Sequence, residues 1–155
     1  MELERNNHQK KSLQTIKKTN NKNNKKEKEQ TKMTDISLYE RIGGKDAVDV
    51  AVEKFYEKVL KDPLLIPFFV NTDMNRQIRM QKLFLTYAFG GSKQWSGKNM
   101  RAAHTKTVEK GLSDQHFDAV VGHLATTLKE LGVKPEDIQE VARIAETIRA
   151  DVLNK

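Results

Sequence analysis

The sequence contains no cysteine among its 155 residues. Disulfide bonds, metal sites built from thiolates and cysteine nucleophiles are therefore excluded. Histidine becomes the softest metal ligand that the chain offers, so a transition metal held by a side chain would be held by histidine. The chain has four histidines, and three of them lie between Met100 and Leu124.

Proline and glycine are also scarce, with three and eight residues respectively. Long stretches of helix formers with few turn residues argue against a sandwich or barrel of short strands, and they predict an all-α fold. No apolar run approaches the ~20 residues that would span a bilayer, and the N-terminal region lacks the apolar segment of a secretory signal. We therefore expect a cytoplasmic protein without a membrane span.

The formal net charge of +7 is concentrated at one end of the chain. Residues 1–34 hold ten Lys or Arg and four Glu, whereas residues 35–155 hold 18 cationic and 17 acidic side chains. The first segment has too little apolar surface to offset its ordering entropy, so we expect a disordered basic extension followed by one domain at 35–155. The extension is either an electrostatic arm or a solvated tail. Met33 is a possible second translation start.

Apolar residues recur at helical spacing along the rest of the chain. We expect helices over Ser37–Ile42, Asp46–Lys61 and Met74–Phe89, a short helical turn around His104, a helix from Ser113 or Asp114 to Gly132, and a last helix that begins at Pro135. Gly43 and Gly44 supply the left-handed conformation that ends a helix. The corner PLLIPFF is too short for an ordinary helix and too apolar for an exposed loop.

The expected helix Met74–Phe89 breaks its apolar pattern at Gln77 and Gln81. These two amides fall on the stripe that Phe84 and Ala88 continue. A buried amide without a partner costs a few kcal/mol, so the glutamines are either exposed to solvent or face a polar ligand. Tyr56, on the inner side of the preceding helix, is either a packed aromatic or a further polar group of such a site.

His104 precedes a helix with a strongly apolar face, which is a suitable position for a ligand to a buried cofactor. The alternative is a histidine at the surface or at the edge of the core. His116 and His123 lie seven residues apart and share a face about 100° from the centre of the apolar stripe. We interpret both as histidines on the flank of their helix.

The motifs of hydrolysis and nucleotide binding are absent from the sequence. There is no HExxH, no paired acid and histidine pattern on facing helices and no glycine-rich phosphate loop, and the carboxylates are scattered over polar faces. One candidate histidine ligand, two phenylalanines, a tryptophan and several methionines suit a flat apolar cofactor that carries its own iron. These residues point to haem.

The sequence resembles the group I truncated haemoglobins in a series of motifs. In chain order these are LYERIGG, VEKFYEKVL, PFFVNTDM, MQKLF with YAFGG, MRAAH and HFDAVVGHL. The resemblance covers residues 37–155. It implies a shortened globin in which a two-over-two helical sandwich encloses haem b.

The resemblance implies a role for several residues. It makes His104 the proximal ligand of the iron, Tyr56 the distal tyrosine, and Gln77 and Gln81 the residues of the distal helix that face bound gas. Phe69 falls where the family packs a phenylalanine on the haem. The remaining positions expected to line the haem or to lie near its propionates are Thr72, Met74, Arg76, Phe84, Trp95 and Met100, with Lys106 as a second candidate cation for a propionate.

Two departures from some cyanobacterial members bear on the haem. Those members carry a distal-helix histidine where this chain has Met80, which argues against coordination by two histidines. They also carry a histidine on the last helix that bonds a haem vinyl group, whereas this chain has no histidine after His123. We therefore expect haem b to be bound non-covalently.

Three functions are consistent with the resemblance. The first is reversible O2 binding with slow release, because a tyrosine hydroxyl and amides in a pocket of low dielectric stabilise O2, which gains negative charge when bound, more than neutral CO. The second is NO dioxygenation, which yields nitrate and needs an external electron-donating reductase. Ile78, Leu85 and Val120 are compatible with an apolar tunnel for NO. The third is a basic adaptor whose tail binds nucleic acid or a membrane. We expect no specific nucleic-acid partner and a monomer or weak homodimer.

Overall fold

The computed structural model of the chain describes residues 36–95 and 97–155 and consists of helices in these ranges. The elements are α2 (Leu38–Ile42), α3 (Gly44–Val59), the 3-10 turn η1 (Ile66–Phe69), α4 (Met74–Ala88), α5 (Met100–Glu109), α6 (Asp114–Glu130) and α7 (Pro135–Val152). No strand occurs in the described ranges. The predicted all-α fold is therefore confirmed.

Side-chain caps explain where several helices begin. The side chains of Ser37, Asp73 and Asn99 each accept a hydrogen bond from a backbone N–H in the first turn of α2, α4 and α5. These bonds satisfy donors that a helix N-terminus leaves without a partner. Gly43 ends α2 with a φ of 127°, and Gly44, with a φ of 70°, begins α3 at once. A side chain at Gly43 or Gly44 would be strained in this turn.

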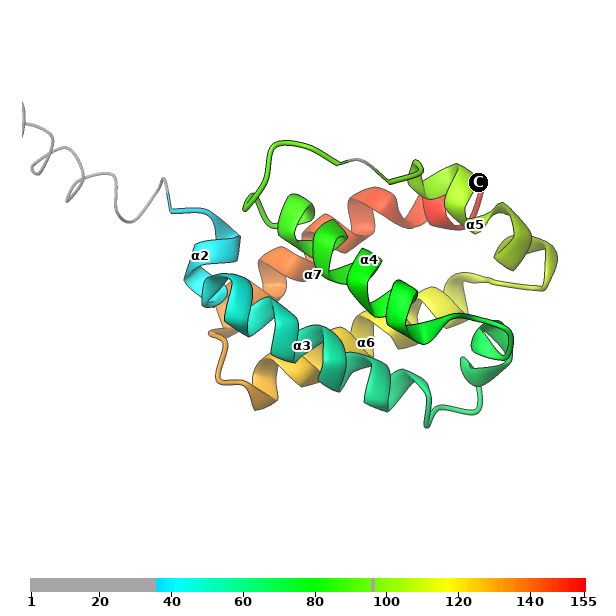
Figure 1. Ribbon diagram of the computed structural model, residues 1–155, viewed down its shortest axis with the longest axis horizontal. Helices are drawn as coiled ribbons and strands as arrows, with labels where there is room; N and C mark the ends of the chain where they lie inside the picture. The colour runs from blue at the N-terminus through cyan, green and yellow to red at the C-terminus, as the bar shows by residue number, and fades with distance from the viewer. Residues whose placement is uncertain (1–35, 96) are drawn as a thin grey trace, which may run out of the picture. The chain divides into compact units, whose positions relative to one another are not determined.

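The helices pack in two layers. Helix α3 packs against α4 and α6, and α7 packs against α6 and α5, so that the pair α3 and α4 lies against the pair α6 and α7 (Figure 1). The short α2 contacts α3 and α7. An ion pair of 3.0 Å between Arg41 of α2 and the buried Asp137 of α7 contributes to this contact. The arrangement is the predicted two-over-two sandwich.

Buried apolar residues form two separate clusters. The larger one joins α2, α3, α4, α6 and α7, and it includes Val52, Phe55, Tyr56 and Leu128. The smaller one consists of Phe117, Val152 and Leu153, with Met100 of α5 packed against it. Helix α5 has no buried residue and α4 only Leu85, so both helices keep apolar side chains half-buried. These two helices carry most of the predicted site.

The apolar corner between α3 and α4 forms the single 3-10 turn η1. Asp62 organises its start, since its carboxylate accepts from the Leu64 N–H at 3.0 Å and its carbonyl accepts from the N–H groups of Leu65 and Ile66. Leu65 is fully buried, whereas Phe68 and Phe69 are half-buried. The prediction that this corner is not a long helix is confirmed, whereas its shielding from solvent is partial, because Pro63, Ile66 and Pro67 are exposed.

The predicted basic extension, residues 1–34, and the possible start at Met33 lie outside the described residues. The boundary at residue 35 therefore stays a prediction. In the described ranges, no helix is both long and apolar enough to cross a membrane.

Candidate functional site

Tyr56, Gln77 and Gln81 form a hydrogen-bonded group between α3 and α4. The Gln77 amide nitrogen donates to the Tyr56 hydroxyl at 3.0 Å, and the hydroxyl lies 3.5 Å from the Gln81 amide oxygen. Tyr56 is only 3% exposed, while both glutamines are half-buried. The amides that interrupt the apolar stripe of α4 are thus partners of a buried hydroxyl rather than simply solvated. At 3.5 Å the second bond is at the limit of hydrogen-bond geometry, so a better acceptor would readily replace it.

Burial determines the protonation state of Tyr56. Loss of solvation raises the pKa of its phenol to about 12, although the hydrogen bond from Gln77 opposes this shift. A buried phenol resists ionisation because the phenolate would lose the stabilisation that water provides. The hydroxyl therefore keeps its proton throughout the physiological range. A protonated hydroxyl beside two uncharged amides can donate to an acceptor that carries partial negative charge.

Aromatic contacts fix the ring of Tyr56. Phe55 meets it edge to face with ring centroids 4.9 Å apart, and Phe69 of η1 does so at 6.0 Å. Edge-to-face pairs at such separations are favourable beyond the area they bury. The predicted haem-facing Phe69 therefore lies next to the predicted distal tyrosine.

His104 is half-buried on α5, and one of its ring nitrogens is already engaged. Its Nδ1 lies 2.7 Å from the backbone carbonyl of Met100, one turn earlier. A carbonyl can only accept, so Nδ1 carries the proton, and the lone pair of Nε2 is available to a metal. This is the tautomer that a metal ligand requires. His104 makes no hydrogen bond or ring contact with Tyr56, Gln77 or Gln81 in the described ranges.

Residues 151–155 fasten α5 on both sides of His104. The Asn154 amide donates to the Arg101 carbonyl at 3.1 Å, and its oxygen lies 3.4 Å from the Thr105 hydroxyl. The Arg101 guanidinium in turn contacts Asp151 at 3.3 Å and the Lys155 carbonyl at 2.8 Å. Asn154 has a φ of 55°. No local pattern indicates this contact, because its partners are about 50 residues apart.

The other predicted haem contacts fall into two groups. Phe69, Met74 and Phe84 pack against the large cluster that contains Tyr56, whereas Met100 packs against the small cluster. Trp95 meets Phe84 edge to face at 5.4 Å. Thr72 is half-buried and Arg76 is exposed. Arg76 and Lys106 have no ion-pair partner in the described ranges, so each is free to meet an anionic group.

His116 and His123 have structural partners, as expected for histidines on the flank of α6. His116 accepts from the Ser113 N–H at 3.0 Å in a capping box and meets the Phe68 ring at 4.8 Å. His123 Nε2 lies 2.7 Å from the Asp62 carboxylate. This contact, together with the Leu64 N–H, lowers the pKa of Asp62. Sequence reasoning did not single out Asp62, which is 61 residues from His123.

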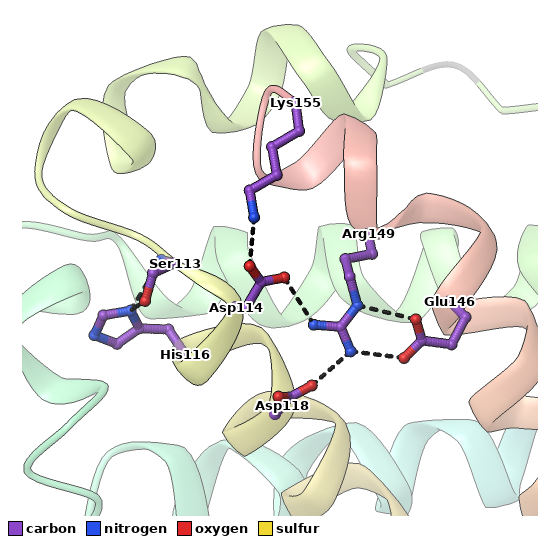
Figure 2. A network of polar contacts seen from close by, with 7 residues as sticks. All are labelled: Ser113, Asp114, His116, Asp118, Glu146, Arg149 and Lys155. Carbon is purple, nitrogen blue, oxygen red and sulfur yellow. Dashed lines mark hydrogen bonds and ion pairs between the residues drawn. The ribbon is translucent and has the colours of Figure 1, made fainter.

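Carboxylates also gather around Arg149, contrary to the expectation that they are scattered. The guanidinium contacts Asp114 at 3.1 Å, Asp118 at 2.5 Å and Glu146 at 2.6 Å, and Lys155 adds a further contact to Asp114 (Figure 2). Glu146 and Asp118 hold the pKa of Arg149 above its ordinary value. The guanidinium also lies 4.5 Å from the centre of the Phe117 ring. This network links α6 to α7, and Lys155, whose carbonyl accepts from Arg101, connects it to α5.

The donor set suits a metal that brings most of its own ligands. In the described ranges there is no group of three or more His, Asp or Glu side chains that could hold a bare ion. A single imidazole with a free Nε2, half-buried apolar residues on α4 and α5, and an uncharged polar group around Tyr56 are instead the surroundings in which a haem iron functions. The described residues fit haem on these grounds.

Comparison with known proteins agrees with this geometry. Residues 37–154 match the bacterial-like globin family. A group 1 truncated hemoglobin of Synechocystis sp. is 51% identical over 122 residues, which cover 77% of this chain and 98% of that protein. The crystal structure of a 2/2 hemoglobin of Synechococcus sp., described as having covalently attached heme, is 54% identical with a TM-score of 0.75, and the match covers 77% of this chain and all of that one.

A second solved relative bears on the polar group. The truncated hemoglobin of Tetrahymena pyriformis is 45% identical with a TM-score of 0.72, and the match covers 77% of this chain and 100% of that one. Its solved structures include variants of one tyrosine and of two glutamines. Those three positions are spaced by 21 and 4 residues, as Tyr56, Gln77 and Gln81 are.

Proposed function

This chain belongs to the bacterial-like globin family and, within it, to the group 1 truncated haemoglobins, and on that premise we propose that it binds O2 reversibly and releases it slowly. Membership makes it a haem globin that binds gaseous ligands. The observation that carries the proposal of slow release is the uncharged hydrogen-bonding group of Tyr56, Gln77 and Gln81. A globin whose distal residues were all apolar would lack the hydrogen bonds that slow the release of O2.

In this proposal His104 is the proximal ligand. Its Nδ1 proton is directed to the Met100 carbonyl, which fixes the orientation of the ring and increases the basicity of Nε2. His104 would hold haem through Nε2, and bound haem would supply an iron that takes up O2, CO or NO. Phe69, Thr72, Met74, Phe84, Trp95 and Met100 provide the surrounding contacts, while Arg76 and Lys106 are the cations for the propionates.

The distal residues have distinct tasks in this proposal. Tyr56 keeps its proton, since its pKa is raised to about 12, and donates a hydrogen bond to the ligand. Gln77 donates to the Tyr56 oxygen, which leaves the hydroxyl hydrogen free to point elsewhere. The Tyr56 hydroxyl lies 3.5 Å from the Gln81 amide oxygen, so this hydrogen bond is weak. The hydroxyl can therefore donate to O2 instead at little cost. Donors fixed before the ligand arrives stabilise developing negative charge more effectively than water does.

We propose further that haem b is held without a covalent bond. The chain has no histidine after His123, and His123 itself is engaged by Asp62. Extraction with acidified butanone should therefore remove all haem from the purified protein and leave a chain of unaltered mass. A mass increase equal to that of haem after extraction would contradict non-covalent binding.

The function is tested by stopped-flow spectroscopy on the ferrous protein. Mixing O2-saturated protein with excess CO measures O2 release, and slow release that accelerates in Tyr56→Phe supports the proposal. Rapid release in the wild type that Tyr56→Phe leaves unchanged would overturn it. Mixing the same O2-saturated protein with NO tests the alternative of NO dioxygenation, for which stoichiometric nitrate and turnover sustained by an added reductase are the criteria.

A further inference from the structure

Charge is unevenly distributed within the globin unit. The 35 residues from Met74 to Val108, which include α4, the following loop and most of α5, contain seven Lys or Arg and no Asp or Glu. The rest of residues 35–155 contains 11 cationic and 17 acidic side chains, a net charge of −6. The net charge of residues 35–155 is therefore nearly zero only because a strongly basic segment and an acidic remainder offset each other. The basic segment carries both Gln77 and His104.

Most of these cations are free. Lys82 pairs with Glu53 at 3.2 Å and Arg101 with Asp151 at 3.3 Å. The other five are exposed and have no ion-pair partner in the described ranges: Arg76, Arg79, Lys93, Lys98 and Lys106. Arg76 and Lys106 are the candidates for the haem propionates, which leaves Arg79, Lys93 and Lys98 without a role in the site.

The segment that carries these three cations also exposes apolar side chains. Arg79, Leu83 and Tyr87 follow one another at intervals of four residues on α4, so they share a face. Leu83 is 51% exposed and Tyr87 41% exposed. The segment that follows α4 brings Trp95 onto this face, where its ring stacks on Tyr87 with centroids 6.5 Å apart.

The loop that presents the cations is held in place. The Trp95 indole N–H donates to the Lys98 carbonyl at 3.0 Å. A Cβ at position 97 would lie only 2.1 Å from the indole ring of Trp95, so the close approach of the backbone to this ring requires glycine. Lys98 is therefore fixed beside Trp95. We call Arg79, Leu83, Tyr87, Lys93, Trp95 and Lys98 the basic face.

We propose that the basic face docks an acidic electron-donating protein. The proposal rests on the proposed function, because a globin unit that binds O2 or oxidises NO forms ferric haem that must be reduced again. In each transfer the reduced iron–sulfur or flavin centre of the partner loses one electron and the ferric iron gains it, with no bond formed or broken. Charge complementarity steers such a partner to the segment that carries His104, and the net charge of −6 on the rest of residues 35–155 disfavours the other surfaces of the globin unit.

The side chains of the basic face favour a protein over a polyanion. Trp, Tyr and Arg are the residues that most often dominate protein interfaces. One face of Trp95 is covered by Tyr87 and its ring also meets Phe84, so it offers little surface on which a base could stack. A nucleic acid long enough to extend beyond the basic face would also meet the acidic remainder of the unit.

Titration with an acidic [2Fe–2S] ferredoxin tests the proposal. Calorimetry on the full-length, haem-loaded ferric chain should detect binding that weakens as the salt concentration rises. The variant R79E/K93E/K98E should weaken the affinity at low salt by at least about tenfold. The matched control K54E/K129E/R143E makes the same change of charge at exposed cations outside the basic face, and its affinity should stay within about twofold of wild type. Chemical-shift mapping of wild-type protein should show perturbations at α4 and residues 90–99.

The proposal would be overturned by no binding at low salt, by equal loss of affinity in the two triple variants, or by shift perturbations confined to other helices. A single-stranded oligonucleotide or a second copy of this chain that occupies the basic face while ferredoxin does not would also overturn it. The Soret band and circular dichroism confirm that each variant is folded. The release of O2 requires no electron donor, so the two proposals are tested independently. Measured O2 release can contradict the proposed function while ferredoxin still binds, and it can support that function while ferredoxin does not bind.

Discussion

The side-chain amide of Asn154 donates a hydrogen bond to the backbone carbonyl of Arg101, over a distance of 3.1 Å. This bond joins the end of α7 to the turn of α5 that leads to His104, and the backbone of Asn154 has a left-handed φ of 55°. A contact between two segments 53 residues apart therefore helps to hold α5, the helix that carries His104.

Replacing Asn154 should loosen α5. Asn154→Gly removes the hydrogen bonds but keeps the backbone relaxed, so it should lower the free energy of unfolding by about 1 kcal/mol. Asn154→Ala should cost about 1–2 kcal/mol more, because an alanine is strained in the left-handed region. Urea denaturation of the haem-loaded protein measures both. Equal stability of the two variants would contradict the role assigned to the backbone conformation.

Removing the distal donors should accelerate O2 release. A hydrogen bond to a group that carries charge contributes roughly 1.5–3 kcal/mol, which corresponds to a factor of about 10–150 in rate. Tyr56→Phe, Gln77→Leu and Gln81→Leu should each increase the O2 dissociation rate, with Gln77→Leu acting through the orientation of Tyr56. CO dissociation should change much less, because bound CO carries little charge.

Tyr87→Phe is the matched control for the distal variants, since Tyr87 lies on α4 but is exposed and belongs to the basic face. Its O2 dissociation rate should equal that of wild type. Unchanged rates in all three distal variants would show that the hydrogen bonds around Tyr56 do not reach the ligand.

Alkaline pH should destabilise the protein through Tyr56. Its pKa is raised in the folded state from 10.0 to about 12, so the unfolded chain releases this proton at lower pH than the folded one. The contribution of the neutral phenol is complete below pH 10, and it is lost as the pH rises towards 12. Between pH 10 and pH 12 the free energy of unfolding of wild type should fall by about 2–3 kcal/mol more than that of Tyr56→Phe, as measured by denaturation at each pH.

His104→Gly should abolish the normal ferrous spectrum of the haem-loaded protein. The variant lacks the imidazole whose Nε2 is free, and added imidazole should restore a five-coordinate histidine-type spectrum by occupying the space. His116→Gln is the matched control, because His116 caps α6 and packs on Phe68. A His104→Gly spectrum identical to that of wild type would refute the assignment of the proximal ligand.

The helices were largely predictable because local signals define them. Ser113 caps α6 and Pro135 begins α7, as expected from capping preferences, and periodicity identified the buried residues of α3. The pairing of Tyr56 with Gln77 was harder to predict from the sequence. From the pattern alone the glutamines had two interpretations, and only the resemblance to truncated haemoglobins favoured the inward one. Their roles towards a ligand, like that of His104, stay predictions.

Contacts between distant segments could not be read from periodicity. His123 and Asp62, or Arg149 and Asp118, are surface-type residues that meet only because α6 packs beside the end of α3 and beside α7. No local rule distinguishes a carboxylate that binds a distant arginine from one that is solvated. Trp95 illustrates the same limit, since its stacking on Tyr87 depends on the path of a loop without a regular pattern.

The group around Tyr56 consists of a phenol that stays protonated and two amides that never ionise. No member of it changes charge between about pH 5 and pH 9, the range in which a histidine donor would titrate. The hydrogen bonding to O2 that we propose for these residues should therefore be the same in an acidified cell as in an alkaline one. Any acid-sensitive release by this globin would have to originate on the proximal side or at the protein surface.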